Sequence, residues 1–443
     1  MALCINQIRC LWRPSKHKKM SAIRVTHISA NDIRGGAARA AYRLHFALHT
    51  AGIASQMFVR KKTSQDADVS ALKSPGGWLR NRLRMWRKEW IKREFAQYQS
   101  IGGIDYDLFT DDRSLYRKEV LEQLPTCDLI NVHWIAKFID YQTFFPSIAR
   151  RRIPLIWTLH DMNPFTGGCH YDRGCGRFVE GCGKCPQLKS SDANDLSRQI
   201  WRRKQRAFAQ LPDDGLHIVA LCQWMAHEVR RSPLFNRFPM SIIPNGLDTS
   251  VFAPRDRRAA REMFQLPQDR KVVLFVAGAL KDVRKGLIFL QQAIEQIPNT
   301  EKLLLVSVGK TEWEGEMRVP YQALGMIEDE RMMSFAYSAA DLFVIPSLQD
   351  NLPNTVMEAM ACGVPVVGFD VGGIPDMVRP GVTGISVPPK DAAALGAAIA
   401  TLLNQPERLA EMSRHCCRIA REEYDAVLQA KRYRELYDTL CAK

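Results

Sequence analysis

Short, mostly apolar runs separated by polar segments divide the first half of the chain. Such runs are typical of strands that are buried in a parallel sheet. We expect strands at Ile23–Ser29, Ser55–Arg60, Asp128–His133, Leu155–Leu159 and His217–Leu221, with a helix from about Ala37 to Thr50 after the first of them.

The second half of the chain repeats this alternation. Strands are expected at Lys271–Val276, Lys302–Val308, Leu342–Ile345 and Val364–Phe369, and helices at Leu287–Gln296, Thr355–Ala361 and Ala392–Asn404. The segment from Pro406 to Leu440 is expected to be helical throughout. Strands that alternate with helices predict parallel sheets of the doubly wound kind.

Pro, Asn and Gly cluster between Pro244 and Pro254, which marks a linker between two such halves. The fold class is therefore predicted to be α/β, with two Rossmann-like parallel-sheet domains. We place the first domain at residues 21–243 and the second at residues 244–410.

The charge of the 443-residue chain is unevenly placed. The formal net charge is +15, and residues 1–100 hold 20 basic and 5 acidic side chains, so residues 101–443 are balanced. This pattern favours one localised basic face over the chain-wide positive coat of a nucleic-acid-binding protein. No nucleic acid is expected as a partner.

Residues 1–20 have neither the apolar core nor the cleavage site of a secretory signal, and a regular pattern begins near Met20. We expect a disordered extension here. The sequence leaves open whether translation starts at Met1 or at Met20. No apolar run reaches the roughly 18 residues of a membrane-spanning helix. With 12 cysteines and no export signal, the reducing cytoplasm is the expected location.

The basic excess is concentrated in the segment Trp78–Arg93. Between Arg80 and Arg93 seven residues are basic and one is acidic, and apolar residues recur at positions 79, 83, 86 and 90. A cationic amphipathic helix with tryptophans suits the interface of an anionic bilayer. Alternatively, the apolar stripe packs on the domain and the basic residues face water.

The clearest chemical signal is the segment Pro346–Pro365, PSLQDNLPNTVMEAMACGVP. A predicted strand ends here in a loop that carries Asp350, and the helix that follows carries Glu358. The free N–H groups at the start of such a helix bind anions. Glu358 can accept hydrogen bonds from two ribose hydroxyls, and Asp350 can accept them from a sugar. The segment thus predicts a nucleotide-sugar pocket, and the alternative is a helix cap with a solvated Glu.

Residues 346–376 resemble the signature of glycosyltransferase family 4, which consists of retaining enzymes with the GT-B fold. The signature contains a Glu-x7-Glu pair, whose positions are held here by Asp350 and Glu358. The resemblance implies that Glu358 holds the nucleotide ribose and that Asp350 acts at the donor sugar. It also implies that the backbone N–H groups of Asn351 and Leu352 lie near the sugar or the phosphate.

The GT-B fold consists of two Rossmann-like domains that face each other across a cleft, and the resemblance implies that the last helix, 415–443, crosses back onto the N-terminal domain. The segment Gly278–Gly286 resembles the phosphate loop of the family. Arg284 and Lys285 are therefore expected to neutralise the departing diphosphate without a metal cofactor. The alternative is that both side chains lie on a solvated turn.

Two features of the first half also resemble the family. Gly35 and Gly36 resemble its Gly-Gly turn, where the backbone approaches the donor phosphate or the acceptor, and a simple strand–helix turn is the alternative. His160 ends a predicted strand where the family has a histidine near the donor sugar. We expect His160 to be catalytic together with Asp350 and Lys285, while a structural histidine remains the alternative. His133, also at a strand end, is a weaker candidate.

An insertion at residues 167–186 holds four cysteines: Cys169, Cys175, Cys182 and Cys185. Their spacing, C-x5-C-x6-C-x2-C, includes one C-x2-C knuckle but is not that of a standard zinc finger. A structural zinc site, reduced thiols and disulfides are all open. Because the insertion follows His160 directly, it is expected to lie at the cleft and to shape the acceptor pocket. It resembles an insertion in a subset of exopolysaccharide glycosyltransferases.

Together with the predicted pocket, the resemblance therefore implies a retaining glycosyltransferase that moves a sugar from a nucleotide-diphosphate sugar to a saccharide acceptor. The resemblance implies an acceptor carried on a polyprenyl diphosphate, in extracellular polysaccharide synthesis at the inner face of the plasma membrane. The alternatives are a non-hydrolysing sugar-nucleotide epimerase or a phosphorylase of the same fold, and a nucleic-acid-binding protein.

Overall fold

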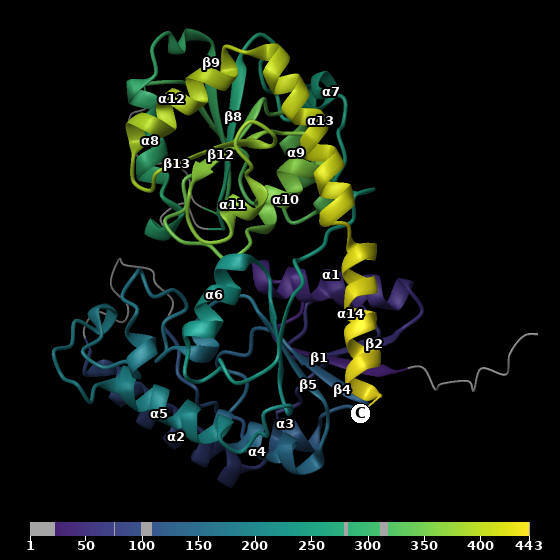
Figure 1. The fold of residues 1–443 in the computed structure, drawn as a ribbon, viewed down its shortest axis with the longest axis vertical. Coiled ribbons are helices and arrows are strands. Elements are labelled where there is room, and N and C mark those ends of the chain that lie inside the picture. Colours follow the sequence, from purple (N-terminus) through teal and green to yellow (C-terminus); the bar gives the residue numbers. More distant parts are fainter. Residues whose placement is uncertain (1–22, 75, 99–108, 279–281, 311–317, 443) are drawn as a thin grey trace, which may run out of the picture.

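The computed structural model describes residues 23–74, 76–98, 109–278, 282–310 and 318–442. The expected extension at residues 1–20 lies outside them. The described residues form two lobes that lie one above the other in Figure 1, each built around a parallel sheet. The prediction of two Rossmann-like parallel-sheet domains is confirmed.

The first lobe contains a seven-stranded parallel sheet with the order β3-β2-β1-β4-β5-β6-β7. Its strands are buried because their residues are mostly apolar on both faces. The strands are β1 (Arg24–Asn31), β2 (Ala54–Lys61), β3 (Val69–Ala71), β4 (Leu129–Val132), β5 (Leu155–Leu159), β6 (His217–Ala220) and β7 (Met240–Ile242). The helices are α1 (Gly36–Thr50), α2 (Trp78–Ala96), α3 (Glu119–Glu122), α4 (Tyr141–Arg151), α5 (Leu196–Phe208) and α6 (Gln223–Arg231).

The second lobe contains a six-stranded parallel sheet with the order β10-β9-β8-β11-β12-β13. Its strands are β8 (Lys271–Val276), β9 (Leu303–Val308), β10 (Tyr321–Ala323), β11 (Leu342–Ile345), β12 (Val366–Phe369) and β13 (Gly384–Val387). The helices of this half are α7 (Arg257–Met263), α8 (Leu287–Gln296), α9 (Glu330–Ser338), α10 (Asn354–Ala361), α11 (Ile374–Met377), α12 (Ala392–Leu403) and α13 (Pro406–Glu423).

In both sheets the strand order reverses once, between β1 and β4 in the first lobe and between β8 and β11 in the second. Loops at such a reversal diverge to opposite faces of the sheet, which leaves room for a ligand at the carboxyl ends of the strands. The fold therefore directs attention to the loops that follow β1, β4, β8 and β11.

The expectation of one continuous helix from Pro406 to Leu440 is wrong, because the helix is interrupted at Tyr424 and Asp425. The backbone N–H of Leu247 donates to the carbonyl of Tyr424 at 3.0 Å, and that of Ala426 donates to the carbonyl of Leu247 at 2.9 Å. Leu247, in the segment that links the lobes, is thus hydrogen-bonded to the backbone between two helices. This tertiary contact takes the place of the hydrogen bonds that would continue the helix.

The final helix, α14 (Ala426–Cys441), lies along the first lobe and packs against α1 (Figure 1). Two buried tyrosines attach it to the first sheet. The hydroxyl of Tyr433 lies 2.8 Å from the Oγ1 of Thr158, and the side-chain amide of Asn131 donates to the hydroxyl of Tyr437 at 3.2 Å. The chain therefore crosses from the second lobe back to the first.

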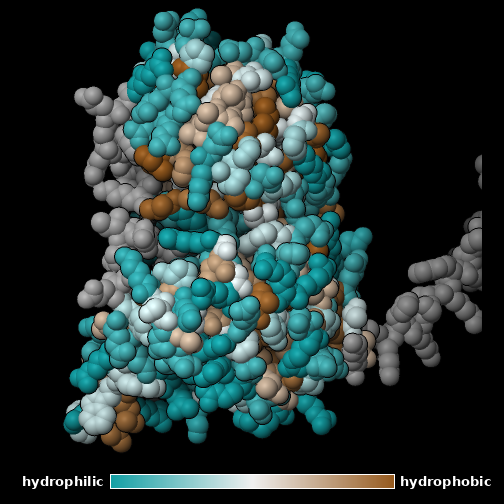
Figure 2. Space-filling view, turned by 60° about the vertical axis from the view of Figure 1, so that its left-hand side comes forward, coloured by the Kyte–Doolittle hydropathy of each residue, from teal (hydrophilic) through white to brown (hydrophobic). Residues whose placement is uncertain are grey.

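Hydrophilic residues cover most of the face of both lobes that is visible in Figure 2, and hydrophobic residues form separate patches. No helix among the described residues combines the length and apolarity that crossing a bilayer requires. The large exposed apolar side chains that do occur include six from α2, which are considered below.

Candidate active site

The loops that follow β5 and β1 in the first lobe meet the loop between β11 and α10 in the second. The side-chain amide of Asn351 donates to the carbonyl of Leu159, at the end of β5, at 2.9 Å. The amide of Asn354, at the start of α10, donates to the carbonyl of Gly36 at 3.0 Å. These contacts between lobes place the predicted site residues at one interface.

Asp350 lies at this interface and is held by the two predicted phosphate-binding cations. Its Oδ2 is 2.5 Å from the Nζ of Lys285 and 3.3 Å from the Nη1 of Arg284. Burial alone would raise the pKa of Asp350, but the positive charges of Lys285 and Arg284 outweigh it and lower that pKa. Asp350 is therefore ionised, and the three side chains form one charged cluster.

The described part of the phosphate loop reaches this cluster through Gly286. The φ angle of Gly286 is +71°, and a Cβ at this position would lie 1.9 Å from the carbonyl oxygen of Pro346. Only glycine fits such a conformation and approach. The close contact fixes Arg284 and Lys285 beside the loop that carries Asp350, while residues 279–281 of the same loop lie outside the described residues.

Asn351 and Leu352 are both buried at the lobe interface. Besides its bond to Leu159, the side chain of Asn351 accepts a hydrogen bond from the thiol of Cys222 at 3.1 Å. Helix α10 then begins at Asn354 without a side-chain cap, so its first N–H groups are not satisfied by a capping side chain. Asn351 thus connects the loop before this helix to the first lobe.

Glu358 points toward the first lobe rather than into water. One carboxylate oxygen accepts a hydrogen bond from the Nη2 of Arg43, on α1, at 2.7 Å, and the other accepts one from the hydroxyl of Tyr337 at 2.9 Å. Arg43 also binds Glu330 at 2.8 Å, and its Nη1 is buried without a hydrogen-bond partner among the described residues. The carboxylate still has free lone pairs that ribose hydroxyls could use.

Gly35 and Gly36 end the loop after β1 and open α1. Gly35 has a φ angle of +97°, which disfavours any other residue, although a Cβ there would meet no atom within 4 Å. Gly36 contributes the carbonyl that binds Asn354. The pair therefore serves the backbone conformation of the turn and its approach to α10.

His160 directly follows β5, next to the carbonyl of Leu159 that binds Asn351. Its Nε2 lies 3.1 Å from the Nδ1 of His133. Burial lowers the pKa of His160 to about 4, against a smaller opposing effect of Asp161. The imidazole is therefore neutral near pH 7. The structure brings His160 to the same interface as Asp350 and Lys285.

The predicted insertion contacts the loop that carries Asp350. The guanidinium of Arg284 lies over the ring of Tyr171, 4.7 Å from its centroid. The side chain of Gln349 donates to Asp172 at 3.0 Å and accepts from the backbone N–H of Arg173 at 3.0 Å. The insertion thus covers one side of the charged cluster.

The four cysteines of the insertion do not form the zinc site or the disulfides that the sequence left open. All ten cysteines that the structure describes are free thiols. No group of three or more His, Cys, Asp or Glu in this part of the chain is placed to hold a metal ion. The cysteines instead line a cavity of about 20 Å³ with Phe109 and Phe178, and burial raises the pKa of Cys182 to about 12. They are free thiols that line one cavity.

Several residues of this interface lie outside the motifs that the sequence singled out. Arg43, Tyr337 and His27 carry no motif spacing, because their partners are brought to them by the tertiary fold. Arg43 and Glu358 are separated by 315 positions in the chain. The one available signal for Arg43 was its place on the helix that follows the Gly-Gly turn.

Two family models match most of the chain. Residues 34–251 match the model described as Glycosyltransferase Family 4, and residues 270–405 match the model described as Glycosyl transferases group 1. A D-inositol 3-phosphate glycosyltransferase from Catenulispora acidiphila is 32% identical over 221 residues, which are 46% of this chain and 51% of that protein. The match thus spans about half the length of that relative.

A D-inositol 3-phosphate glycosyltransferase from Mycobacterium bovis is 26% identical over 368 residues, covering 78% of this chain and 67% of that protein. Among solved structures, sucrose-phosphate synthase from Thermosynechococcus elongatus is similar in fold, with a TM-score of 0.64, 22% identity and coverage of 95% of this chain and 99% of that one. Anabaena Alr3699/HepE in complex with UDP-glucose gives 0.61, with 17% identity and coverage of 94% and 100%. With its two parallel sheets, its matched halves and its returning helix, the chain belongs to glycosyltransferase family 4 and has the GT-B fold.

Proposed function

We propose that the protein is a retaining glycosyltransferase that moves a sugar from a nucleotide-diphosphate sugar to a saccharide acceptor. The observation that carries the proposal is the cluster of Asp350, Lys285 and Arg284 at the interface of the lobes, where Asn351 also binds the carbonyl next to His160. Two cations and a carboxylate, with a neutral imidazole at the same interface, suit a diphosphate leaving group attached to a sugar.

Each group has a separate task in this proposal. Lys285 and Arg284 neutralise the charge that builds up on the departing nucleoside diphosphate, and no metal is needed for this step. Asp350 accepts hydrogen bonds from the donor sugar. Glu358 accepts them from the ribose while it keeps its bond to Arg43. The acceptor hydroxyl attacks on the face that the diphosphate leaves, which is the retaining outcome.

The contacts between the lobes support a closed reaction chamber. Asn351 and Asn354 join the second lobe to backbone carbonyls of the first, and Gln349 joins it to the insertion. A closed interface excludes water, which would otherwise hydrolyse the activated sugar. We propose that donor and acceptor enter when these hydrogen bonds open and that the bonds re-form around them.

The proposed acceptor is a saccharide on a lipid diphosphate, used in extracellular polysaccharide synthesis at the inner face of the plasma membrane. The support comes from α2. Leu79, Leu83, Trp86 and Trp90 lie on one face of this helix and are between 51% and 65% exposed. The apolar stripe is therefore more than half exposed, in contrast to the alternative that it packs on the domain, although the guanidinium of Arg113 lies over the ring of Trp90 at 4.5 Å. It is flanked by arginines and lysines that suit anionic headgroups.

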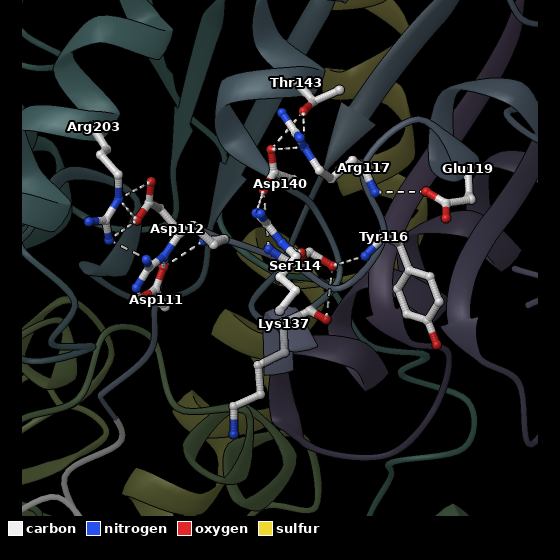
Figure 3. Close-up of polar contacts among 12 residues, drawn as sticks. Asp111, Asp112, Ser114, Tyr116, Arg117, Glu119, Lys137, Asp140, Thr143 and Arg203 are labelled. Carbon is white, nitrogen blue, oxygen red and sulfur yellow. Dashed lines mark hydrogen bonds and ion pairs between the residues drawn. The ribbon is translucent and has the colours of Figure 1, made fainter. Parts of the chain in front are cut away.

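The side of α2 next to this stripe is fixed to the first lobe by charged contacts. Arg87 binds Asp140 at 2.5 Å and donates to the carbonyl of Ser114 at 2.7 Å, and Glu94 binds Arg113 at 2.5 Å. Figure 3 shows Asp140 and Ser114 within this polar network, with Asp112 and Arg203 beside it. These contacts hold the helix in one orientation, which favours a built docking face over a loose segment.

The test is release of nucleoside diphosphate with and without an acceptor. A thermal-shift screen first identifies the nucleotide sugar, because a ligand of the folded state raises the unfolding temperature. With that donor, we expect rapid diphosphate release only when a lipid-linked saccharide extract is added, together with a glycosylated product of retained configuration. Interconversion of the sugar nucleotide without net release of diphosphate would instead identify an epimerase, and release without any acceptor would show hydrolysis and contradict the proposal. Release with inorganic phosphate and formation of a sugar phosphate would identify a phosphorylase.

A further inference from the structure

Three histidines from neighbouring strands form a row that ends at the candidate active site. His27 lies within β1, His133 follows β4, and His160 follows β5, and these three strands are adjacent in the first sheet. His27 and His133 are 0% and 2% exposed, while His160 is partly exposed. We call these three residues the histidine row.

The rings of the histidine row are linked through their nitrogens. Nδ1 of His27 lies 2.9 Å from Nε2 of His133, and Nδ1 of His133 lies 3.1 Å from Nε2 of His160. The ring centroids are 5.2 and 5.3 Å apart and the planes are tilted by 28° and 31°. This spacing fits imidazoles that share hydrogen bonds edge to edge, so the row is one continuous hydrogen-bonded chain.

All three imidazoles are neutral. Burial lowers the pKa of His27 and of His133 well below its usual value, and lowers the pKa of His160 to about 4. The titratable groups that face the row are His45, on α1, whose ring centroid is 6.2 Å from that of His27, and Asp161, next to His160. His45 lowers the pKa of His27 further, and Asp161 raises that of His160 by less than burial lowers it.

A neutral imidazole has one N–H group and one lone pair, on opposite nitrogens. Each hydrogen bond in the row joins an N–H to a lone pair, so the tautomer of one ring determines the tautomer of the next. Only two arrangements are consistent with both bonds. In one, every ring carries its proton on Nε2, and in the other, every ring carries it on Nδ1.

The inner end of the row distinguishes the two arrangements. Nε2 of His27 is buried and has no hydrogen-bond partner among the described residues. A buried N–H group without an acceptor is rarer in proteins than an acceptor without a donor. The proton of His27 therefore belongs on Nδ1, where it is donated to His133, and His133 in turn donates its own proton to Nε2 of His160. His160 then carries its proton on Nδ1.

We propose that His27 and His133 are positioning residues that hold His160 as the Nδ1–H tautomer, so that it presents an N–H donor to the substrate. No hydrogen bond to Nδ1 of His160 is formed by the residues that the structure describes, so this nitrogen is available. The inference rests on the proposed function, in which His160 faces the donor sugar. A neutral donor can bind a sugar or leaving-group oxygen without adding positive charge beside an oxocarbenium-like transition state.

The first measurement is the tautomer of His160 in the folded protein. Imidazole nitrogen chemical shifts and their couplings to the ring protons, recorded on histidine-labelled protein, distinguish Nδ1–H from Nε2–H. His160 is assigned by the signals that are lost in His160→Asn. We expect Nδ1–H in the unsubstituted protein, and an Nε2–H signal for His160 would overturn the inference.

The second measurement removes the central ring. In His133→Phe, which cannot hydrogen-bond, His160 should lose its single tautomer, and kcat should fall by roughly tenfold while the KM for the donor changes little. His133→Asn keeps an N–H donor on the side of His160 and should restore part of both the signal and the rate. His217→Phe is the matched control, because His217 is in β6 of the same sheet and outside the row.

The outcomes separate this inference from the proposed function. If His160→Asn abolishes transfer but His133→Phe leaves both the tautomer and kcat unchanged, the histidine row does not position His160 and the inference is wrong. If His160→Asn transfers sugar at the normal rate while the tautomer is Nδ1–H, the row exists but His160 does not serve the substrate, and the assigned role of His160 fails.

Discussion

At the scale of single residues, the candidate site depends on charges that compensate one another. Asp350 is buried, yet its pKa is lowered, because Lys285 and Arg284 lie within hydrogen-bonding distance of its carboxylate. Two cations share the carboxylate of Asp350, and Arg284 also pairs with Asp282 at 3.4 Å, so both cations are already held in place by carboxylates before an anion binds. Both cations are already in position when a diphosphate enters beside Asp350, so neither side chain has to move there from water.

Replacing Lys285 by methionine tests this arrangement, because methionine keeps the length of the side chain and removes the charge. We expect the affinity for nucleoside diphosphate to fall roughly 10- to 100-fold, which is the usual range for one charge-assisted hydrogen bond. Binding of the nucleoside without phosphate should not change. Isothermal titration of both ligands measures this, with Lys302→Met on the same lobe as the control. Equal weakening for both ligands would place Lys285 away from the diphosphate.

The histidine row predicts how stability depends on pH. The folded protein keeps His160 neutral down to about pH 4, whereas the unfolded chain binds that proton near pH 6.5. Between these values the unfolded state holds more protons, so the free energy of unfolding falls as the pH is lowered. His27, His133 and His45, whose pKa values are also lowered by burial, contribute below pH 6.5, whereas the lowered pKa of Asp161 acts only below about pH 3.8.

His133→Phe removes one of these titrating groups. The free energy of unfolding should then fall less steeply between pH 6.5 and pH 5, by about 1.4 kcal/mol per pH unit, which is the effect of one proton. Urea unfolding at several pH values gives the slope. An unchanged slope would show that His133 is not neutral in the folded protein, whatever the substitution does to the stability itself.

At the scale of elements, α2 is unusual because its large apolar side chains are exposed. None of its residues is buried, and its apolar stripe is more than half exposed beside the side on which Arg87 and Glu94 fix the helix to the lobe. Large tryptophans exposed beside basic residues are characteristic of helices that lie at the interface of an anionic membrane.

Substituting Leu83 and Trp86 by serine tests the role of this stripe without disturbing packing, since both side chains are more than half exposed. We expect the unsubstituted protein to sediment with vesicles that contain phosphatidylglycerol, and less so with phosphatidylcholine alone or at high salt. The double variant should bind roughly tenfold more weakly. The matched control replaces Met263 and Ile288, two exposed apolar residues of the second lobe. If the α2 variant and the control bind equally well, α2 is not the docking face.

The elements that the sequence predicted best are the buried strands. β5, β8 and β11 begin and end where their apolar runs do, because a parallel strand covered on both faces reads as a continuous apolar run. The short edge strands β3 and β10 could not be found in this way, since three residues that are only partly buried or mixed in burial leave no pattern. The break before α14 was missed because it results from the contact with Leu247 and not from a local signal.

The site itself was predictable only where one motif carries it. Asp350, Asn351 and Glu358 lie on one loop and the helix that follows it. Their separation in the sequence therefore determines how far apart they lie in the structure. Arg43 and His27 act through partners on other elements, and a single sequence holds no record of those contacts. For the cysteines, spacing alone left zinc, disulfides and reduced thiols open, and the structure describes free thiols, because this choice depends on how the insertion packs.

At the scale of the whole molecule, the two lobes are joined where the reaction would occur. Arg43 on the first lobe binds Glu330 and Glu358 on the second, and it is almost fully buried there. A buried ion pair is costly to break by removing one partner, because the other charge is left uncompensated. The contact therefore couples the carboxylate that is assigned to the ribose with the relative position of the lobes.

Glu358→Gln tests the central assignment most directly, because glutamine keeps the shape of the side chain and still accepts a hydrogen bond from Arg43. The measurement is transfer of labelled sugar from the nucleotide sugar to the lipid-linked acceptor, with thermal unfolding to verify the fold. The control is Glu407→Gln, an exposed position on α13.

We predict that kcat/KM falls roughly 100-fold in Glu358→Gln, since a site built to accept two ribose hydroxyls loses one acceptor and gains an unpaired donor. The control should transfer sugar at the unsubstituted rate. A folded Glu358→Gln protein that also transfers sugar at that rate would contradict the nucleotide-sugar site proposed for this interface.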